Sequence, residues 1–184
     1  MPYNVPTTTT DDISFGPAVV YVGAAGSTPA TQVGAITEDG VTLEITSEKR
    51  VITQGNPRVP LYTFVQAQGV MVKFTSIEWN FENFAKALGA GVTTVSASEE
   101  TFAFGGDPIN TAFSMHIEHY MAQSGNTMNV YVWEAASESG ITTPFGQDEH
   151  QFELSFMALR KTSDWGGTSL PAKEQLIKFV RALT

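Results

Sequence analysis

Hydrophobic and polar residues alternate with a period of two along much of this chain, which is the pattern of β-strands. The clearest case is the segment 41–77, where two strand-like arms flank a group of turn residues. In the first arm, apolar side chains at positions 41, 43 and 45 alternate with Thr42 and Glu44. The two arms, residues 41–53 and 62–74, are much longer than the usual strand of about 5–6 residues. We therefore expect a hairpin that projects beyond a small domain.

The turn between the two arms is rich in glycine and proline, which interrupt strand pairing because proline fixes φ and lacks an N–H donor. The predicted hairpin tip comprises Gln54, Gly55, Asn56, Pro57, Arg58, Val59 and Pro60. A projecting arm needs another surface to rest on. The hairpin therefore favours a protein that assembles with other subunits.

Shorter strands and one helix are predicted in the rest of the chain. The strands are expected at residues 18–22, 32–36, 100–104, 112–121, 128–134 and 151–160, with a turn at 38–40 before the long hairpin. Residues 112–134 form a second hairpin around a Ser-Gly-Asn turn. Residues 172–183 fit either a helix or a terminal strand, and the strand is favoured.

The predicted helix covers residues 76–89, because apolar residues recur there at helical spacing. The stripe consists of Ile77, Phe81, Phe84, Ala85 and Leu88. Ser76 or Asn80 is the expected N-terminal cap, and Gly89 suits the left-handed position that ends many helices. We expect this helix to pack its apolar face against a sheet.

These elements predict one all-β domain over residues 13–184, a β-sandwich or barrel with one flanking helix and a long projecting hairpin. The 184-residue chain is long enough for a sizeable core. Residues 1–12 are expected to form an extended arm, since two prolines and four consecutive threonines discourage a helix.

Composition and charge narrow the functional classes. Only 16% of the residues are charged, below the usual ~25%, which indicates a neutral polar surface of the kind that often faces other subunits. The net charge of −9 argues against a groove that grips nucleic-acid phosphates. The chain has no cysteine, no apolar run of about 20 residues and no signal-peptide pattern, so we expect no disulfide, no membrane insertion and assembly in the cytoplasm.

Catalytic and metal-binding patterns are weak. His116 and His119 form the one histidine cluster, but residues three apart on a strand point to opposite faces and do not chelate one ion together. No phosphate loop, Gly-x-Ser-x-Gly motif or cysteine nucleophile is present. We expect no enzyme activity, no cofactor and no metal.

A polar strand face in the long hairpin stands out instead. Its predicted members are Thr42, Glu44, Thr46 and Glu48 on the first arm, with Gln66 and Gln68 adding polarity on the second. Such a face either meets bulk solvent or lines a channel shared by several subunits. In a channel, the carboxylates repel DNA phosphates, so that DNA slides through without binding tightly.

The order of these motifs resembles the major tail tube proteins of long-tailed bacteriophages, over roughly residues 15–180. The resemblance rests on Glu-Asp-Gly-Val-Thr-Leu at 38–43, the hairpin tip, the helix ending in Leu-Gly-Ala-Gly at 88–91, Phe-Glu-Leu-Ser-Phe-Met-Ala-Leu-Arg-Lys at 152–161, and Leu-Pro-Ala-Lys-Glu-Gln-Leu-Ile-Lys-Phe at 170–179.

The resemblance implies a virion protein whose hexameric rings stack into a hollow tail tube. Sheets from six subunits close into one barrel around a lumen, and the long hairpin reaches the adjacent ring. The implied partners are further copies of the chain, the tape measure protein, the tail terminator and distal tail proteins, and DNA in transit. The tubes of contractile tails and of type VI secretion share this fold and remain alternatives.

A different class, a β-sandwich adhesion or receptor-binding module, also fits an all-β chain. It would use exposed aromatic rings to stack on sugars, and the candidates are Tyr131, Trp133 and Trp165.

Overall fold

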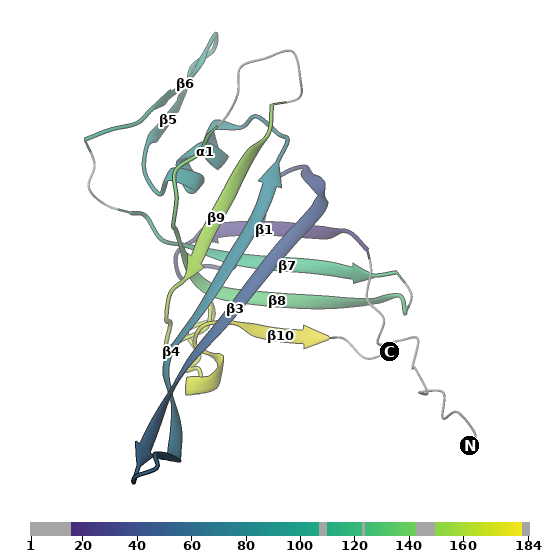
Figure 1. Ribbon diagram of the computed structural model, residues 1–184. Helices are drawn as coiled ribbons and strands as arrows, with labels where there is room; N and C mark the ends of the chain where they lie inside the picture. The colour runs from purple at the N-terminus through teal and green to yellow at the C-terminus, as the bar shows by residue number, and fades with distance from the viewer. Residues whose placement is uncertain (1–15, 107–109, 123, 143–149, 182–184) are drawn as a thin grey trace.

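A computed structural model describes residues 16–106, 110–122, 124–142 and 150–181, and a large antiparallel sheet dominates it (Figure 1). The elements in chain order are β1 (Ala18–Ala24), β2 (Thr31–Gln32), β3 (Ile36–Gln54), β4 (Val59–Ser76), α1 (Phe81–Leu88), β5 (Val92–Val95), β6 (Glu100–Ala103), β7 (Phe113–Met121), β8 (Asn126–Ser137), β9 (Phe152–Ala158), the 3₁₀ turn η2 (Ala172–Glu174) and β10 (Lys178–Arg181). The predicted class, all-β with one α-helix, is confirmed. The expected arm at residues 1–12 lies outside the described residues.

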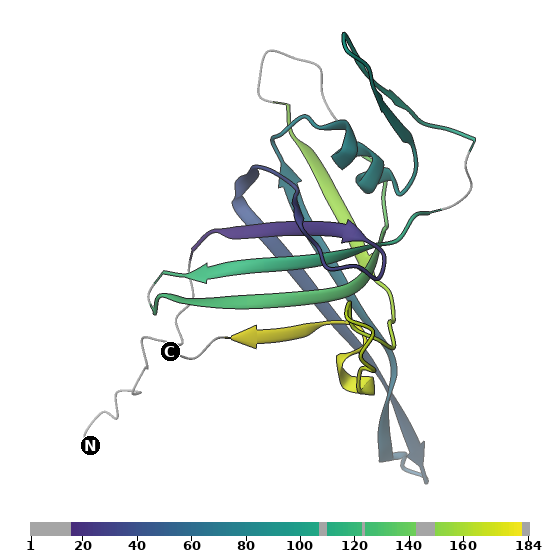
Figure 2. The ribbon, with the colours of Figure 1, turned by 180° about the vertical axis from the view of Figure 1, so that it is seen from behind.

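The large sheet folds over itself into two layers whose strands cross steeply (Figures 1 and 2). Its strand order is β2-β1-β7-β8-β9-β4-β3, and β10 pairs with β8. We call β1, β7, β8 and β10 the cross layer, and β3, β4 and β9 the hairpin layer. The layers are joined where Ala135–Ser137 of β8 pair with Phe156–Ala158 of β9. A separate two-stranded ribbon is formed by β5 and β6.

The hydrophobic core lies between the two layers, and the period-two alternation determines which side chains enter it. Valines, Met115 and Ile117 of the cross layer face the inner residues of β4 and β9. Phe156 lies at the centre, with its ring centroid 4.9 Å from that of Phe113 and 5.8 Å from that of Phe74. The predicted alternation of strands 112–121 and 151–160 is thereby confirmed.

Helix α1 covers one end of this core and is shorter than predicted. Asn80 caps it through its side-chain oxygen, which accepts from the Glu82 N–H at 2.7 Å, and Gly89 ends it at φ 64° as expected. Phe84 packs edge-on against Phe152, with centroids 4.8 Å apart. The predicted start at residue 76 is wrong, because that residue ends strand β4 and Ile77 after it is exposed.

Two other predicted boundaries change. The strand expected at 32–36 is divided between β2 and the start of β3, and the turn expected at 38–40 is an irregularity within β3. Gly40 allows this irregularity through its positive φ of 69°. The preference for a strand over a helix near the C-terminus is confirmed at residues 178–181, which follow the short η2 turn and pair with β8. In the described part of the chain, no helix is long and apolar enough to cross a membrane.

Candidate assembly surfaces

The β3–β4 hairpin extends far beyond the core, as the sequence predicts (Figure 1). Its strands have 19 and 18 residues and pair down to Gln54 and Val59. Strand β9 supports only the base of the hairpin, since it pairs with residues 71–76 of β4. The tip is shorter than the predicted segment 54–60: only the four residues 55–58 form the turn, and the flanking residues Gln54, Val59 and Pro60 belong to the strands.

The outer part of the hairpin exposes many large apolar side chains. Leu61 and Tyr62 leave 60% and 65% of their surface exposed. The other exposed large apolar residues of the hairpin are Ile45, Val51, Ile52, Val59 and Val65. Single exposed apolar residues are ordinary, but a concentration on one projecting element marks an interaction surface. The hairpin therefore has the character of a surface that another chain covers.

The same part of the hairpin is positively charged in an acidic protein. Lys49, Arg50 and Arg58 lie there, and the sequence from 49 to 72 contains no Asp or Glu. The chain as a whole has a net charge of −9. Opposite charges are thus segregated along the molecule, and the hairpin end is its cationic end.

A polar face runs along the hairpin base, as the alternation predicts. Residues directly opposite in an antiparallel pair share a face. The β3 residues Thr42, Glu44, Thr46 and Glu48 lie opposite Lys73, Met71, Gly69 and Ala67 of β4. All four β3 residues are exposed, and the Glu44 carboxylate lies 3.4 Å from the Lys73 ammonium group. We call this surface the outer polar face, because it points away from the core.

The two glutamines predicted to join this face do not belong to it. Gln68 lies opposite Ser47, on the other side of the hairpin, so its grouping with Glu44 is wrong. Gln66 is the extra residue of a bulge, since Glu48 pairs with Ala67 and the next residue, Lys49, pairs with Val65. A bulge breaks the period-two alternation at Gln66, whereas Gln68 is misplaced because the register pairs even-numbered residues of β3 with odd-numbered residues of β4 in this part of the hairpin.

The outer polar face continues onto β9. Lys73 pairs with Ser155, and the neighbouring positions of β9 bring Glu153 and Met157 to the same side. The charged side chains across the three strands are Glu44, Glu48, Glu153 and Lys73. With three carboxylates and one ammonium group, the face has a net negative charge.

Strand β3 leaves a long open edge. It is the last strand in the sheet order, and no strand in the described part of the chain pairs with its outer side. Open edges present a row of unpaired N–H and C=O groups that can pair with another chain. Proteins usually keep such edges short, whereas this one is 19 residues long.

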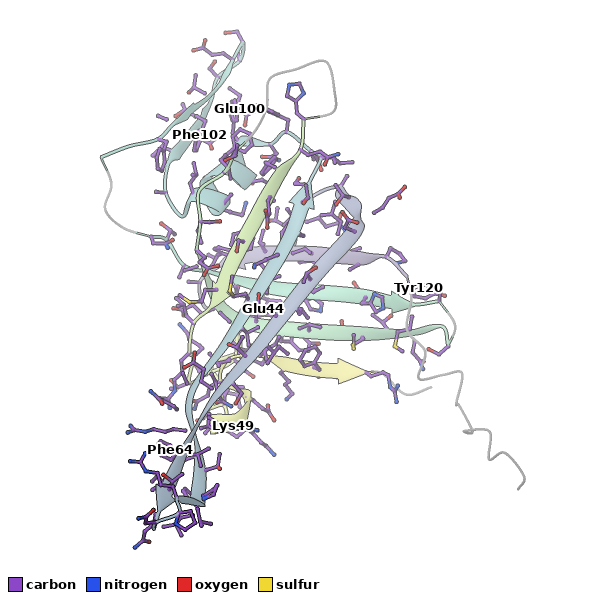
Figure 3. All side chains as sticks on the ribbon, in the orientation of Figure 1. Glu44, Lys49, Phe64, Glu100, Phe102 and Tyr120 are labelled. Atoms are coloured by element: carbon purple, nitrogen blue, oxygen red, sulfur yellow. The ribbon has the colours of Figure 1, made fainter. Side chains whose placement is uncertain are left out.

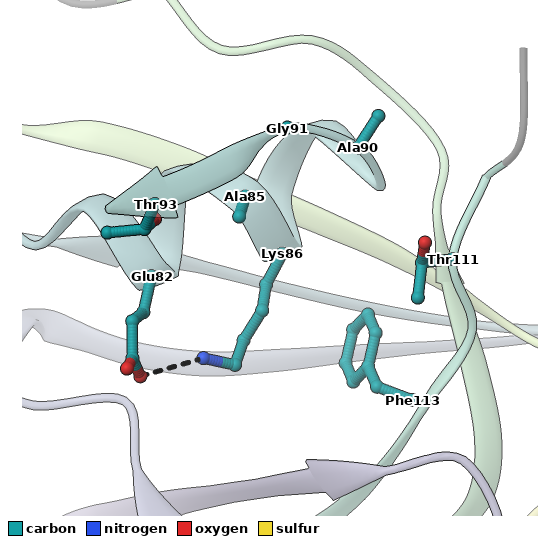
Figure 4. A pocket seen from close by; sticks show the side chains of 8 residues that line it. All are labelled: Glu82, Ala85, Lys86, Ala90, Gly91, Thr93, Thr111 and Phe113. Atoms are coloured by element: carbon teal, nitrogen blue, oxygen red, sulfur yellow. Dashed lines mark ion pairs between the residues drawn. The ribbon is translucent and has the colours of Figure 1, made fainter. Parts of the chain in front are cut away.

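The β5–β6 ribbon is a second exposed surface, which the sequence did not single out. Val92, Val95 and Phe104 are exposed on or beside it, and Glu99 and Glu100 lie at its turn. A recess of about 240 Å³ lies between the ribbon base and α1 (Figure 4). It is lined by Glu82, Ala85, Lys86, Ala90, Gly91, Thr93, Thr111 and Phe113. Its volume falls below the range of about 300–1,000 Å³ that is usual for small-molecule sites.

The aromatic residues proposed as a sugar platform stack on one another instead. Trp133 is only 6% exposed, and its indole N–H donates to the carbonyl of Glu174 in η2 at 2.7 Å. The Tyr131 ring stacks between His116 and Trp133, at centroid distances of 5.0 and 5.6 Å. Trp165 meets Trp133 edge-on at 5.0 Å. The expectation that Trp133 is exposed is wrong.

The histidine cluster is spread over both faces of β7, as predicted. His116 contacts Asn129 through Nε2 at 2.9 Å on the outer side of the cross layer. His119 lies three residues further along β7, opposite Ala18 and Met128, and so on the other face of the strand. Among the residues that the structure describes, no group of three His, Cys, Asp or Glu side chains could hold a metal ion.

The chain was compared with known proteins, and no protein-family model and no curated protein matches it.

Proposed function

We propose that this protein is the structural subunit of a bacteriophage tail tube, in which hexameric rings stack around a lumen for DNA. The observation that carries the proposal is the β3–β4 hairpin, which extends beyond the core and exposes apolar side chains along its outer part. In a monomer the apolar side chains of this hairpin stay exposed to water. In a repeating assembly a neighbouring subunit covers them, and their burial stabilises the assembly.

Ring closure is supported by the open edge of β3. When each subunit pairs this edge with a strand of its neighbour, a closed barrel forms and no edge remains for uncontrolled aggregation. Head-to-tail contacts of this kind generate rings rather than isolated dimers. The low fraction of charged residues fits a surface that is largely buried between subunits.

The outer polar face is proposed to line the lumen. Glu44, Glu48 and Glu153 would repel DNA phosphates, and the exposed threonines keep the wall wettable without adding positive charge. The proposed partners are other copies of the chain, the tape measure protein, the tail terminator and distal tail proteins, and transiting DNA. The proposed location is the virion.

The fold is compatible with the first of two alternative functions but gives no support to the second. A tube subunit of a contractile tail or of type VI secretion has the same fold requirements, and its cargo distinguishes it from a DNA-conducting tube. The adhesion module depended on exposed aromatic rings, and these are buried or stacked on one another. No observation favours it.

The proposal is tested by concentrating the purified protein and imaging it by negative-stain electron microscopy, with sedimentation velocity in parallel. We expect rings and hollow tubes whose amount rises with concentration. A protein that stays monomeric at all concentrations and salt conditions contradicts the proposal.

A further inference from the structure

We propose that the outer part of the hairpin in one copy docks onto the β5–β6 ribbon and the recess beside it in a second copy. We define the distal hairpin as residues 49–65, and the ribbon as β5, β6 and the turn between them. The inference rests on the proposed function, because it names the surface that receives the hairpin when rings stack.

The two surfaces lie at opposite ends of the molecule. Figures 1 and 2 show the hairpin tip at one end and the ribbon at the other, with the two sheet layers between them. Lys49 and Phe64 mark the distal hairpin in Figure 3, and Glu100 and Phe102 mark the ribbon. Copies placed end to end in one orientation bring the distal hairpin of one to the ribbon of the next.

The surfaces are complementary in charge. The distal hairpin carries Lys49, Arg50 and Arg58 and has no acidic residue. The stretch 90–106, which contains the ribbon, carries Glu99 and Glu100 and has no basic residue. Complementary patches guide association and select the correct register.

The surfaces also match in their apolar character. The distal hairpin exposes Ile52, Leu61 and Tyr62, while Val92 and Val95 of the ribbon are 66% and 73% exposed. An exposed apolar ribbon without a third strand is stabilised when another chain covers it.

The geometry of the contact makes it self-propagating. The two patches differ, so the contact is heterologous: each copy still offers a free hairpin or a free ribbon after docking. Such contacts repeat along an axis and give stacked growth. A contact between two identical patches would stop at a dimer.

Disulfide trapping tests the docking directly, because the chain contains no cysteine. Arg58→Cys and Glu100→Cys variants, one with a mass tag, are mixed, assembled and oxidised. We expect a cross-link between tagged and untagged chains, since bridged residues have Cα atoms within about 7 Å. The matched control pairs Arg58→Cys with Glu153→Cys on the outer polar face, and we expect no cross-link there. A control pair that links as well as the test pair overturns the assignment.

Charge reversal supplies a second, independent test. Arg50→Glu with Arg58→Glu, and separately Glu99→Lys with Glu100→Lys, should each raise the concentration needed for tube growth roughly tenfold. Mixing the two reversed variants should restore contact between them. Reversal of Glu38 and Asp39, a consecutive exposed acidic pair on β3, is the control for net charge.

The outcomes separate this inference from the proposed function. The docking site is wrong if tubes form without the Arg58–Glu100 cross-link and their growth is unchanged by charge reversal at the ribbon. The proposed tube function is not contradicted by that result. A chain that forms neither rings nor tubes overturns both.

Discussion

Replacing the exposed cross-strand pair Ile52 and Tyr62 by threonine should weaken assembly while leaving the single chain folded. The two residues face each other across the hairpin, and they leave 48% and 65% of their surface exposed. Threonine is β-branched and, like isoleucine and tyrosine, has good strand propensity. The substitution therefore removes apolar surface with little change to the hairpin itself.

The expected magnitude follows from the exposed surface. The exposed half of Ile52 offers roughly 1 kcal/mol when a partner covers it, at the usual value for burying an aliphatic side chain. The exposed part of Tyr62 offers about 3 kcal/mol, for an aromatic side chain that buries about 150–250 Å². Threonine retains part of this area, so the double variant should lose about 2–3 kcal/mol per contact, or about 30- to 150-fold in association constant.

Sedimentation velocity across a concentration series measures the assembly, and urea unfolding followed by circular dichroism measures the fold. The free energy of unfolding of the single chain should change by no more than about 1 kcal/mol, since an aromatic–aliphatic cross-strand pair contributes about 0.2–1 kcal/mol. The control Ile52→Val with Tyr62→Phe keeps the apolar area and should assemble normally. Unchanged assembly of the threonine variant would refute the burial of the hairpin in the assembly.

Three further predictions concern the outer polar face and the fold. Tubes of the double variant Glu44→Lys with Glu48→Lys should bind DNA in a salt-dependent manner, whereas tubes of the unchanged protein should not, as measured by co-sedimentation. Variant tubes that fail to bind DNA contradict a lumen position for this face. Phe156→Ala should lower the free energy of unfolding by about 3–5 kcal/mol in urea, because the ring is 1% exposed. Gly89→Ala should cost about 2–3 kcal/mol, since φ is 64° and an added Cβ lies 1.9 Å from a side-chain oxygen, whereas Gly140→Ala, with open space around it, should be nearly neutral.

The sequence predicts the hairpin and the core strands well because each follows one simple period. Phe152, Leu154 and Phe156 alternate without interruption, and all three are buried. The helix boundary fails where two patterns overlap. Ile77 fits the helical stripe by spacing, yet the chain is still leaving strand β4 at that point and the residue is exposed.

The candidate surfaces are predictable only in part. Alternation places Glu44 and Glu48 correctly on one face, but it does not give the register of the partner strand, which sets Gln68 opposite Ser47 and leaves Gln66 in a bulge. The sequence pattern predicts a strand at 100–104 but does not single out Glu99 and Glu100 of the ribbon. The significance of the ribbon depends on its lying at the opposite end from the hairpin, which is a property of the fold rather than of any segment.

The most direct test of the tube proposal is a symmetry-resolved electron cryomicroscopy reconstruction of the assembled protein. We expect stacked rings in which the edge of β3 pairs with a neighbouring subunit and Thr42, Glu44, Thr46 and Glu48 face a continuous lumen. An assembly in which these four side chains point to the outside, or in which the β3 edge stays unpaired, would contradict this expectation.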